Sequence, residues 1–253
     1  ILRFVSTQFL NGKRREELAI LKGIVEHGEI GIDRLIAGGS SAESVESAIS
    51  ILSGGFVVGT TAKAHPHRRL VARDRDRLKI GRDLSESLRD PVFREYLEDA
   101  IDCGLEINAK EYSDRDEAGF VLFSKYTRED ACRILNWEKN EYATIYGYKV
   151  KHGTCPIFVT YDKSEDISET TKYDDHFLDR RTFSWITRPN RDLEGSEVVR
   201  IRQHRETGLI IPLFIKKADD EGADHYYMGL VDPIVERIRE SETGGKKVVN
   251  IPM

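Results

Sequence analysis

The sequence has no apolar stretch of the ~18–20 residues that a membrane-spanning helix needs, so a membrane protein is not expected. It has only three cysteines, Cys103, Cys132 and Cys155, which form no CxxC pair and are too few for a disulfide scaffold. Reduced thiols in a cytoplasmic protein are the simplest interpretation. The chain begins with Ile1 and carries no charged-then-apolar secretion signal, which suggests a piece of a longer polypeptide.

The signatures of several enzyme classes are also missing. The sequence has no GxxxxGK[ST] loop for ATP, no HExxH zinc motif and no GxSxG nucleophile motif. We therefore expect that this chain by itself is not an enzyme and needs no cofactor or metal. His65 and His67 flank Pro66 as a metal pair would, but no carboxylate partner is evident. A solvated or phosphate-facing loop is the favoured interpretation.

Charge is distributed unevenly along the chain. Its 39 Lys and Arg against 44 Asp and Glu give a net charge of -5, which does not by itself indicate a nucleic-acid-binding protein. Yet the segment 63–82, here called the basic island, has eight basic and two acidic residues, and 180–205 has seven Arg and three acidic residues. Such local clusters suit contact with phosphates. The predicted contacts to a DNA backbone are Arg68, Arg69, Arg73, Arg75, Arg188 and Arg191.

The hydrophobic pattern of residues 1–105 predicts a helical domain with the element order of a winged helix. The expected elements are a helix at 14–27 ended by Gly28, a strand at 29–32, a short helix capped by Asp33, a helix opened by Ser40 or Ser41, and strands at 56–58 and 70–72 around a basic loop. A further helix is expected at 84–105, with Pro91 as a candidate break. The polar segment 106–118 is predicted to be a linker.

Residues 119–253 have a different texture, with short β-branched and aromatic runs separated by Gly and Pro, which predicts a sheet or a small barrel. Thr127 and Asp130 form an N-cap pattern before a helix at 131–135. A second helix is expected at 234–240, and a tail is expected from Gly244. The expected strands lie at 120–123, 146–150, 156–161, 182–187, 198–201, 209–215 and 225–230.

Aromatic side chains, adjacent carboxylates and an arginine follow one another most densely between residues 172 and 188. An aromatic ring beside a carboxylate can stack on a flipped cytosine and accept a hydrogen bond from its exocyclic amine. Core packing is the favoured alternative for Phe183 and an equal one for Trp185, and the carboxylates could be simple turn residues. The candidate base-binding residues are Tyr173, Asp174, Asp175 and Trp185, with Tyr161 and Tyr148 as reserves for a pocket wall.

Several motifs in a fixed order carry a resemblance to a known family. They are Tyr126–Asp130, Ile134–Trp137, Cys155–Lys163, Lys172–Phe177, Thr182–Arg188, Leu213–Lys217 and Tyr226–Gly229. About residues 118–232 resemble a C-terminal domain that ends bacterial fusions of a phospholipase-D-type nuclease with a superfamily-2 helicase, the architecture of SauUSI-type modification-dependent restriction enzymes. The resemblance implies a β-barrel akin to the SRA and PUA-like domains, of which the SRA domains flip 5-methylcytosine. It also implies that nuclease and ATPase lie elsewhere in a longer polypeptide.

These observations predict an α+β protein with a helical, winged-helix-like domain at 1–105, a linker at 106–118 and a β-barrel base-recognition domain at 119–253. The predicted function is the DNA-recognition module of a type IV restriction enzyme that reads modified cytosine, with 5-methylcytosine as the favoured base. The expected partners are double-stranded DNA with modified bases and the helicase and nuclease domains of the longer polypeptide. The alternative is an interaction module that couples those two domains and binds DNA only nonspecifically.

Overall fold

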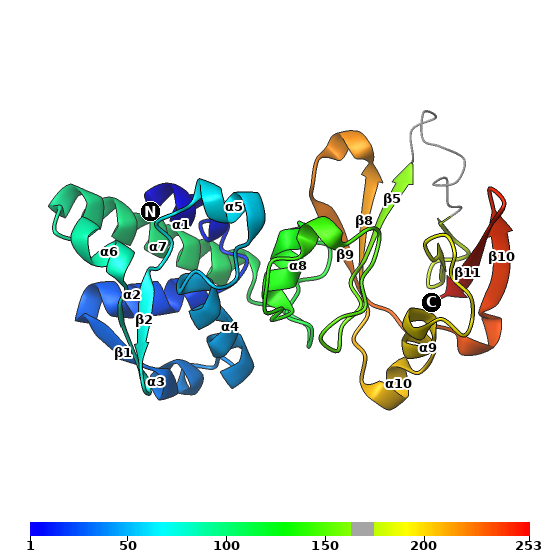
Figure 1. The fold of residues 1–253 in the computed structure, drawn as a ribbon, viewed down its shortest axis with the longest axis horizontal. Coiled ribbons are helices and arrows are strands. Elements are labelled where there is room, and N and C mark those ends of the chain that lie inside the picture. The colour runs from blue at the N-terminus through cyan, green and yellow to red at the C-terminus, as the bar shows by residue number, and fades with distance from the viewer. Residues whose placement is uncertain (163–174) are drawn as a thin grey trace. The chain divides into compact units, whose positions relative to one another are not determined.

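The computed structural model describes residues 1–162 and 175–253, which form two compact units (Figure 1). Unit 1 comprises residues 1–115 and 132–140, and unit 2 comprises residues 116–131 and 141–253. Unit 1 is mainly helical and unit 2 is rich in strands, so the predicted α+β class is confirmed. No helix in the described ranges is both long enough and apolar enough to cross a membrane.

Unit 1 contains seven helices and a small antiparallel sheet in its described residues. Its elements are α1 (Leu2–Gln8), α2 (Glu16–His27), β1 (Glu29–Gly31), α3 (Ile32–Ala37), α4 (Ala42–Leu52), α5 (Gly59–Ala64), β2 (Val71–Asp74), β3 (Arg77–Ile80), α6 (Arg82–Ser87) and α7 (Pro91–Glu111). The order of strands across the sheet is β1-β3-β2. Leu18, Leu21 and Val25 of α2 lie in the core, as the helical spacing predicted.

Local capping signals place the helix ends of unit 1. Gly28 ends α2 with φ 80°, a left-handed conformation that glycine adopts without a steric penalty. Ser41, and not Ser40, caps α4, because its hydroxyl accepts a hydrogen bond from the backbone N–H of Ser44. Asp90 caps α7, and Pro91 takes the first helical position, where its missing N–H costs nothing. The predicted break at Pro91 is therefore confirmed.

Four predictions for unit 1 differ from the structure. Asp33 does not cap the short helix but lies in the first turn of α3, whose N-cap is Gly31. Residues 56–58 form no strand, and α5 occupies the start of the segment predicted as a basic loop. The partner of β2 is β3, which lies inside the basic island and was not predicted. The first part of the predicted 106–118 linker is helical, because α7 continues to Glu111.

Unit 2 contains two four-stranded sheets in its described residues. Its elements are β4 (Lys125–Tyr126), α8 (Arg128–Ile134, which runs into the 132–140 segment of unit 1), the 3-10 helix η1 (Tyr142–Thr144), β5 (Ile157–Asp162), β6 (His176–Phe177), β7 (Phe183–Ile186), α9 (Ser196–Arg202), α10 (His204–Thr207), β8 (Pro212–Ala218), η2 (Asp219–Glu221), β9 (His225–Leu230), η3 (Val235–Arg237), β10 (Arg239–Thr243) and β11 (Lys246–Pro252). One sheet has the order β4-β9-β8-β5 and the other β10-β11-β7-β6. Only the β5–β8 pair is parallel among the paired strands of these sheets.

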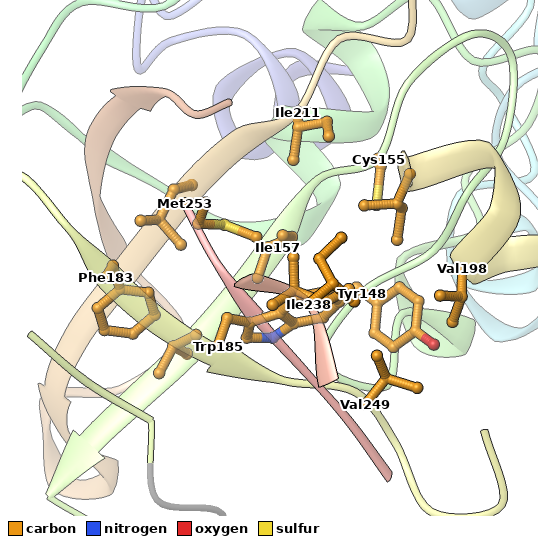
Figure 2. Packing of buried hydrophobic residues seen from close by; sticks show 14 of the residues in the cluster. Tyr148, Cys155, Ile157, Phe183, Trp185, Val198, Ile211, Ile238, Val249 and Met253 are labelled. Carbon is orange, nitrogen blue, oxygen red and sulfur yellow. The ribbon is translucent and has the colours of Figure 1, made fainter. Parts of the chain in front are cut away.

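The predicted barrel is wrong for the described residues, because neither four-stranded sheet closes on itself. The two sheets instead share one hydrophobic core with α9 (Figure 2). Ile157 of β5, Trp185 of β7, Val198 of α9 and Val249 of β11 all lie in this core. A closed sheet is unnecessary here because the apolar faces are covered by each other and by a helix.

The predicted N-cap at Thr127 is confirmed in detail. The Thr127 hydroxyl accepts a hydrogen bond from the backbone N–H of Asp130 at 3.1 Å, and the Asp130 carboxylate accepts one from the backbone N–H of Thr127 at 2.9 Å. This is the reciprocal arrangement of a capping box, with aspartate in place of the usual glutamate or glutamine.

Several strand and helix predictions in unit 2 are wrong. Residues 198–201 belong to α9, where Val198 and Ile201 are three residues apart and both buried. The predicted helix at 234–240 is η3 followed by β10, and the predicted tail is β11, a central strand of its sheet. Residues 120–123 form no strand, because Phe120 enters an aromatic cluster and Phe123 has φ 64°. Residues 146–150 contribute isolated bridges only.

Candidate functional site

The β2–β3 hairpin carries the basic island in unit 1. Its register pairs Val71 with Ile80 and Asp74 with Arg77, so Arg75 and Asp76 form the turn. Arg75 has φ 56°, which places an exposed arginine at the tip in the left-handed region. At the base of the hairpin, a Cβ on Gly81 would lie 2.4–2.6 Å from the backbone of residues 69–71, so only glycine allows this close approach.

Arg68, a predicted DNA contact, holds its own loop together. Its guanidinium donates hydrogen bonds to the carbonyl oxygens of Gly54, Ala62 and His65 at 3.3, 3.0 and 3.0 Å. These bonds use most of its donors on backbone oxygens. The nearby His65 ring packs against Phe4 with centroids 5.3 Å apart, and burial lowers the pKa of His65.

Arg73, a second predicted contact, is paired within unit 1. It donates to both carboxylate oxygens of Glu46 on α4, at 2.9 and 2.6 Å, and to the carbonyl oxygen of Arg75. On the same sheet Arg77 pairs with Glu29, and Lys79 pairs with Asp74. Such exposed pairs contribute little to stability, but their carboxylates offset part of the positive charge of the hairpin.

Four basic side chains of the basic island are exposed and have no side-chain partner in the part of the chain that the structure describes. They are Lys63, Arg69, Arg75 and Arg82. Two of the predicted contacts, Arg69 and Arg75, are therefore available to an external anion. By contrast, α4 has no Lys or Arg in its sequence and exposes Glu43 and Glu46. The electropositive feature of unit 1 is thus the hairpin and its flanks, not the α4 helix.

Arg188 and Arg191 of unit 2 converge on a single internal carboxylate. Arg188 donates to both oxygens of Glu197 at 2.8 and 2.9 Å, and Arg191 donates to one of them at 2.9 Å. The Tyr148 hydroxyl also donates to Glu197, at 3.1 Å, and the Arg188 guanidinium lies 4.5 Å from the Tyr148 ring centroid. We call these four residues the Glu197 cluster.

The protonation states in the Glu197 cluster follow from burial and charge. Burial alone would raise the pKa of Glu197, but the two arginines hold it below its ordinary value, so the carboxylate is ionised at neutral pH. Burial, together with the Glu197 charge, raises the pKa of Tyr148 to about 12. The cluster therefore has one net positive charge on partly exposed side chains.

The predicted base-binding aromatics Tyr148 and Trp185 lie in the core of unit 2 (Figure 2). Trp185 is 3% exposed, and its ring meets the Tyr148 ring edge to face, with centroids 4.8 Å apart. Phe183 is also buried, as its favoured interpretation predicted. Core packing thus uses the faces on which a base would have to stack.

Two more predicted base contacts, Asp175 and Tyr161, lie near β6. Asp175 directly precedes β6 and is buried, and its carboxylate accepts a hydrogen bond from the backbone N–H of Ile186 at 2.9 Å. Tyr161 of β5 is 43% exposed, and its ring lies 6.2 Å from that of Phe177, which is equally exposed. Phe177 lies within the 172–188 segment but was not among the predicted base contacts. Tyr173 and Asp174 lie outside the described residues.

Within the described residues, no group of three His, Cys, Asp or Glu side chains is placed to hold a metal ion.

Comparison with family models gives two matches, both to domains of unknown function. Residues 1–113 match the model described as "Domain of unknown function (DUF8090)", and residues 120–253 match the model described as "Domain of unknown function (DUF3427)". No curated protein matches the chain. Because the second match covers more than half of the sequence, the chain belongs to the DUF3427 family.

Proposed function

We propose that this chain is the DNA-recognition module of a modification-dependent, type IV restriction enzyme. The observation that carries the proposal is the β2–β3 hairpin with the residues just before it, where exposed Arg75 and Arg69 have no side-chain partner in the described structure. Charge of this kind, clustered on a hairpin in a chain of net charge -5, is suited to phosphates of a DNA backbone.

The element order of unit 1 supports a winged-helix assignment. Helix, strand, three helices and a two-stranded hairpin follow one another from α2 to β3, and β3 of the hairpin pairs with β1 in one sheet. The short α5 between α4 and β2 is additional to the winged-helix order. In helix-turn-helix relatives the second helix of the motif usually enters the major groove. Here that helix is α4, whose Glu43 and Glu46 would face the phosphates. We therefore propose that the hairpin, and not α4, grips the duplex.

In unit 2 we propose that the modified base is read near Tyr161, Tyr173 and Asp174. Tyr161 is exposed, whereas Tyr148 and Trp185 are buried, so the last two would support the site from behind. The resemblance to SauUSI-type enzymes supports base flipping, with 5-methylcytosine as the favoured base. It also supports helicase and nuclease domains as partners in a longer, cytoplasmic polypeptide, and no catalysis by this chain itself.

The proposal is tested by equilibrium binding of the full chain to matched duplexes at fixed salt. The duplexes carry cytosine, 5-methylcytosine, 5-hydroxymethylcytosine or a phosphorothioate linkage at one position. We expect the 5-methylcytosine duplex to bind most tightly, with a modest preference, because a buried methyl group contributes only about 0.8 kcal/mol. Equal affinity for all four duplexes would contradict modified-base recognition.

The acidic surface of α4 favours a second candidate function. Exposed Glu43 and Glu46 suit a basic protein surface better than DNA. In this alternative, unit 1 couples a helicase to a nuclease, and DNA binding is nonspecific. Substituting Glu43 and Glu46 with Gln should then weaken association with those domains and leave DNA affinity no lower.

A further inference from the structure

Unit 2 contains a small cavity whose lining residues include none of the Glu197 cluster. It borders the aromatic core, because the His225 ring meets the Phe158 ring edge to face with centroids 5.1 Å apart. Its volume is about 310 Å³, and its walls include Arg128, Glu129, Tyr142, Lys216 and His225. These residues come from α8, η1, β8 and β9, so no local sequence motif predicts the cavity. A space of this size holds a small ligand.

His225 is the most buried polar group of the cavity. It is 2% exposed, and its Nε2 atom has no hydrogen-bond partner in the described structure. Its other ring nitrogen, Nδ1, lies 3.1 Å from the carbonyl oxygen of Ala223 and must carry the hydrogen that this oxygen accepts. Nε2 therefore carries a lone pair in the neutral ring and becomes a donor when the ring is protonated.

Arg128 is a second buried group with unused hydrogen-bonding capacity. Its Nε atom is buried and has no hydrogen-bond partner in the described residues, while its guanidinium lies 5.5 Å from the Phe158 ring centroid. Burial lowers the pKa of Arg128, but the guanidinium stays charged. An unpaired buried donor of this kind is costly unless a ligand or water satisfies it.

Lys216 is the second cationic group of the cavity, beside Arg128. It is 9% exposed, donates to the carbonyl oxygen of Gly222 at 3.1 Å and lies 3.1 Å from the carboxylate of Asp219. An ammonium group has three donors, so one is left for a ligand. Burial, and to a smaller extent the charges of Arg128 and Lys216, lower the pKa of His225, so the imidazole is neutral at pH 7.

We propose that this cavity is a binding site for a phosphoryl group. Arg128 and Lys216 supply charge-assisted donors to the phosphate oxygens. His225 accepts a hydrogen bond from a protonated phosphate oxygen, or takes up a proton and donates to an unprotonated one. Glu129 lines the same cavity, which restricts how the anion is oriented. The group is supplied either by a DNA backbone or by a soluble phosphate, and the two sources share this chemistry.

The test is a titration of the full chain with inorganic phosphate, followed by NMR of the imidazole nitrogens. The His225 signals are assigned by comparison with a His225→Asn variant. We expect a saturable shift of the His225 Nε2 signal with phosphate and no such shift with chloride at equal ionic strength. No saturable shift, or the same shift with chloride, would overturn the site.

Matched variants keep the result specific to the cavity. Lys216→Met retains the aliphatic stem and should weaken phosphate binding by about tenfold or more, since a charge-assisted hydrogen bond is lost. Lys217→Met changes the adjacent, exposed residue of the same strand and should leave binding unchanged. Arg128→Gln should weaken binding as Lys216→Met does. Equal effects of the two lysine variants would overturn the assignment.

A second arm identifies the source of the phosphate. A duplex that competes with phosphate for the His225 signal supports a backbone phosphate as the natural ligand. If the duplex does not compete while phosphate binds, the site belongs to a soluble phosphate. Both conclusions need the saturable shift of the first arm, which does not depend on whether the chain recognises modified DNA.

Discussion

The arginines predicted to contact DNA are paired differently in the two units. In unit 1, Arg75 at the tip of the β2–β3 hairpin and Arg69 just before the hairpin are exposed and have no side-chain partner in the described structure. In unit 2, Arg188 and Arg191 both bind Glu197, and Arg188 also covers the Tyr148 ring. A similar density of arginine in the sequence thus leaves one predicted pair open to an anion and ties the other to an internal carboxylate. Local pairing, and not charge count, decides whether an arginine can reach a phosphate.

The largest expected effect tests whether the aromatics of unit 2 are structural. Trp185→Ala should lower the free energy of unfolding by about 3–5 kcal/mol, because it removes a ring from a packed core. Tyr161→Ala removes a half-exposed ring and should change the free energy of unfolding by only about 0.5 kcal/mol. Urea unfolding followed by circular dichroism measures both. A Trp185→Ala variant as stable as the wild type would mean that the ring is available for a base after all.

The pH dependence of stability tests the buried imidazole of unit 2. Burial, opposed by the bond to Ala223, lowers the pKa of His225 to about 4 from 6.5, with Arg128 and Lys216 lowering it further and Asp224 raising it. The unfolded chain therefore takes up the proton first as pH falls. The free energy of unfolding should drop by about 3 kcal/mol between pH 6.5 and pH 4, and be unaffected by this group above pH 6.5.

This contribution is isolated by comparing the wild type with His225→Asn in urea at pH 7 and pH 4.5. The variant should lose less stability than the wild type over this interval. An identical pH dependence of the two proteins would show that His225 titrates normally in the folded state.

A substitution in the Glu197 cluster tests whether Glu197 holds Arg188 and Arg191 in place. Glu197→Gln leaves two partly buried arginines without their carboxylate and should cost about 1–3 kcal/mol of stability. The matched control is Glu194→Gln, which changes an exposed glutamate two residues before α9. It should leave the free energy of unfolding nearly unchanged. If both variants were equally stable, Arg188 and Arg191 would be as available to DNA as the arginines of the hairpin.

The smallest expected effect concerns the ion pair between Arg73 and Glu46. Glu46→Gln releases Arg73 and removes a negative charge beside the hairpin, so duplex affinity at low salt should rise by up to about fivefold. Glu111→Gln, at the C-terminal end of α7, removes the same charge and serves as the control in fluorescence anisotropy. A fall in affinity for Glu46→Gln would place the DNA away from the hairpin.

Much of unit 1 could be predicted because its signals are local. Gly28, Ser41 and Pro91 act within one helical turn, and each ended or began a helix as expected. Strand β3 was missed because Arg77 and Lys79 alternate with Leu78 and Ile80, so only one side chain of the strand is fully buried. A short, charged hairpin strand looks like a loop when its partner is unknown.

Unit 2 was harder because its structure depends on contacts far apart in sequence. The run at 198–201 is β-branched, yet Val198 and Ile201 bury one face of a helix against the core. Strand β11 follows Gly244 and Gly245 and resembles a tail, but it pairs with β10 and β7. The cavity residues Arg128, Lys216 and His225 come from three separate elements, so their convergence had no sequence signal.

The central claim is that the β2–β3 hairpin, and not the Glu197 cluster, contacts the DNA backbone. The direct measurement is the slope of log affinity against log salt for an unmodified duplex. Arg69→Ala combined with Arg75→Ala should make the slope shallower by about 1.8, since each lost phosphate contact removes about 0.9. Arg188→Ala combined with Arg191→Ala should leave the slope unchanged in protein shown to be folded. A shallower slope for the second pair, with no change for the first, would contradict the account.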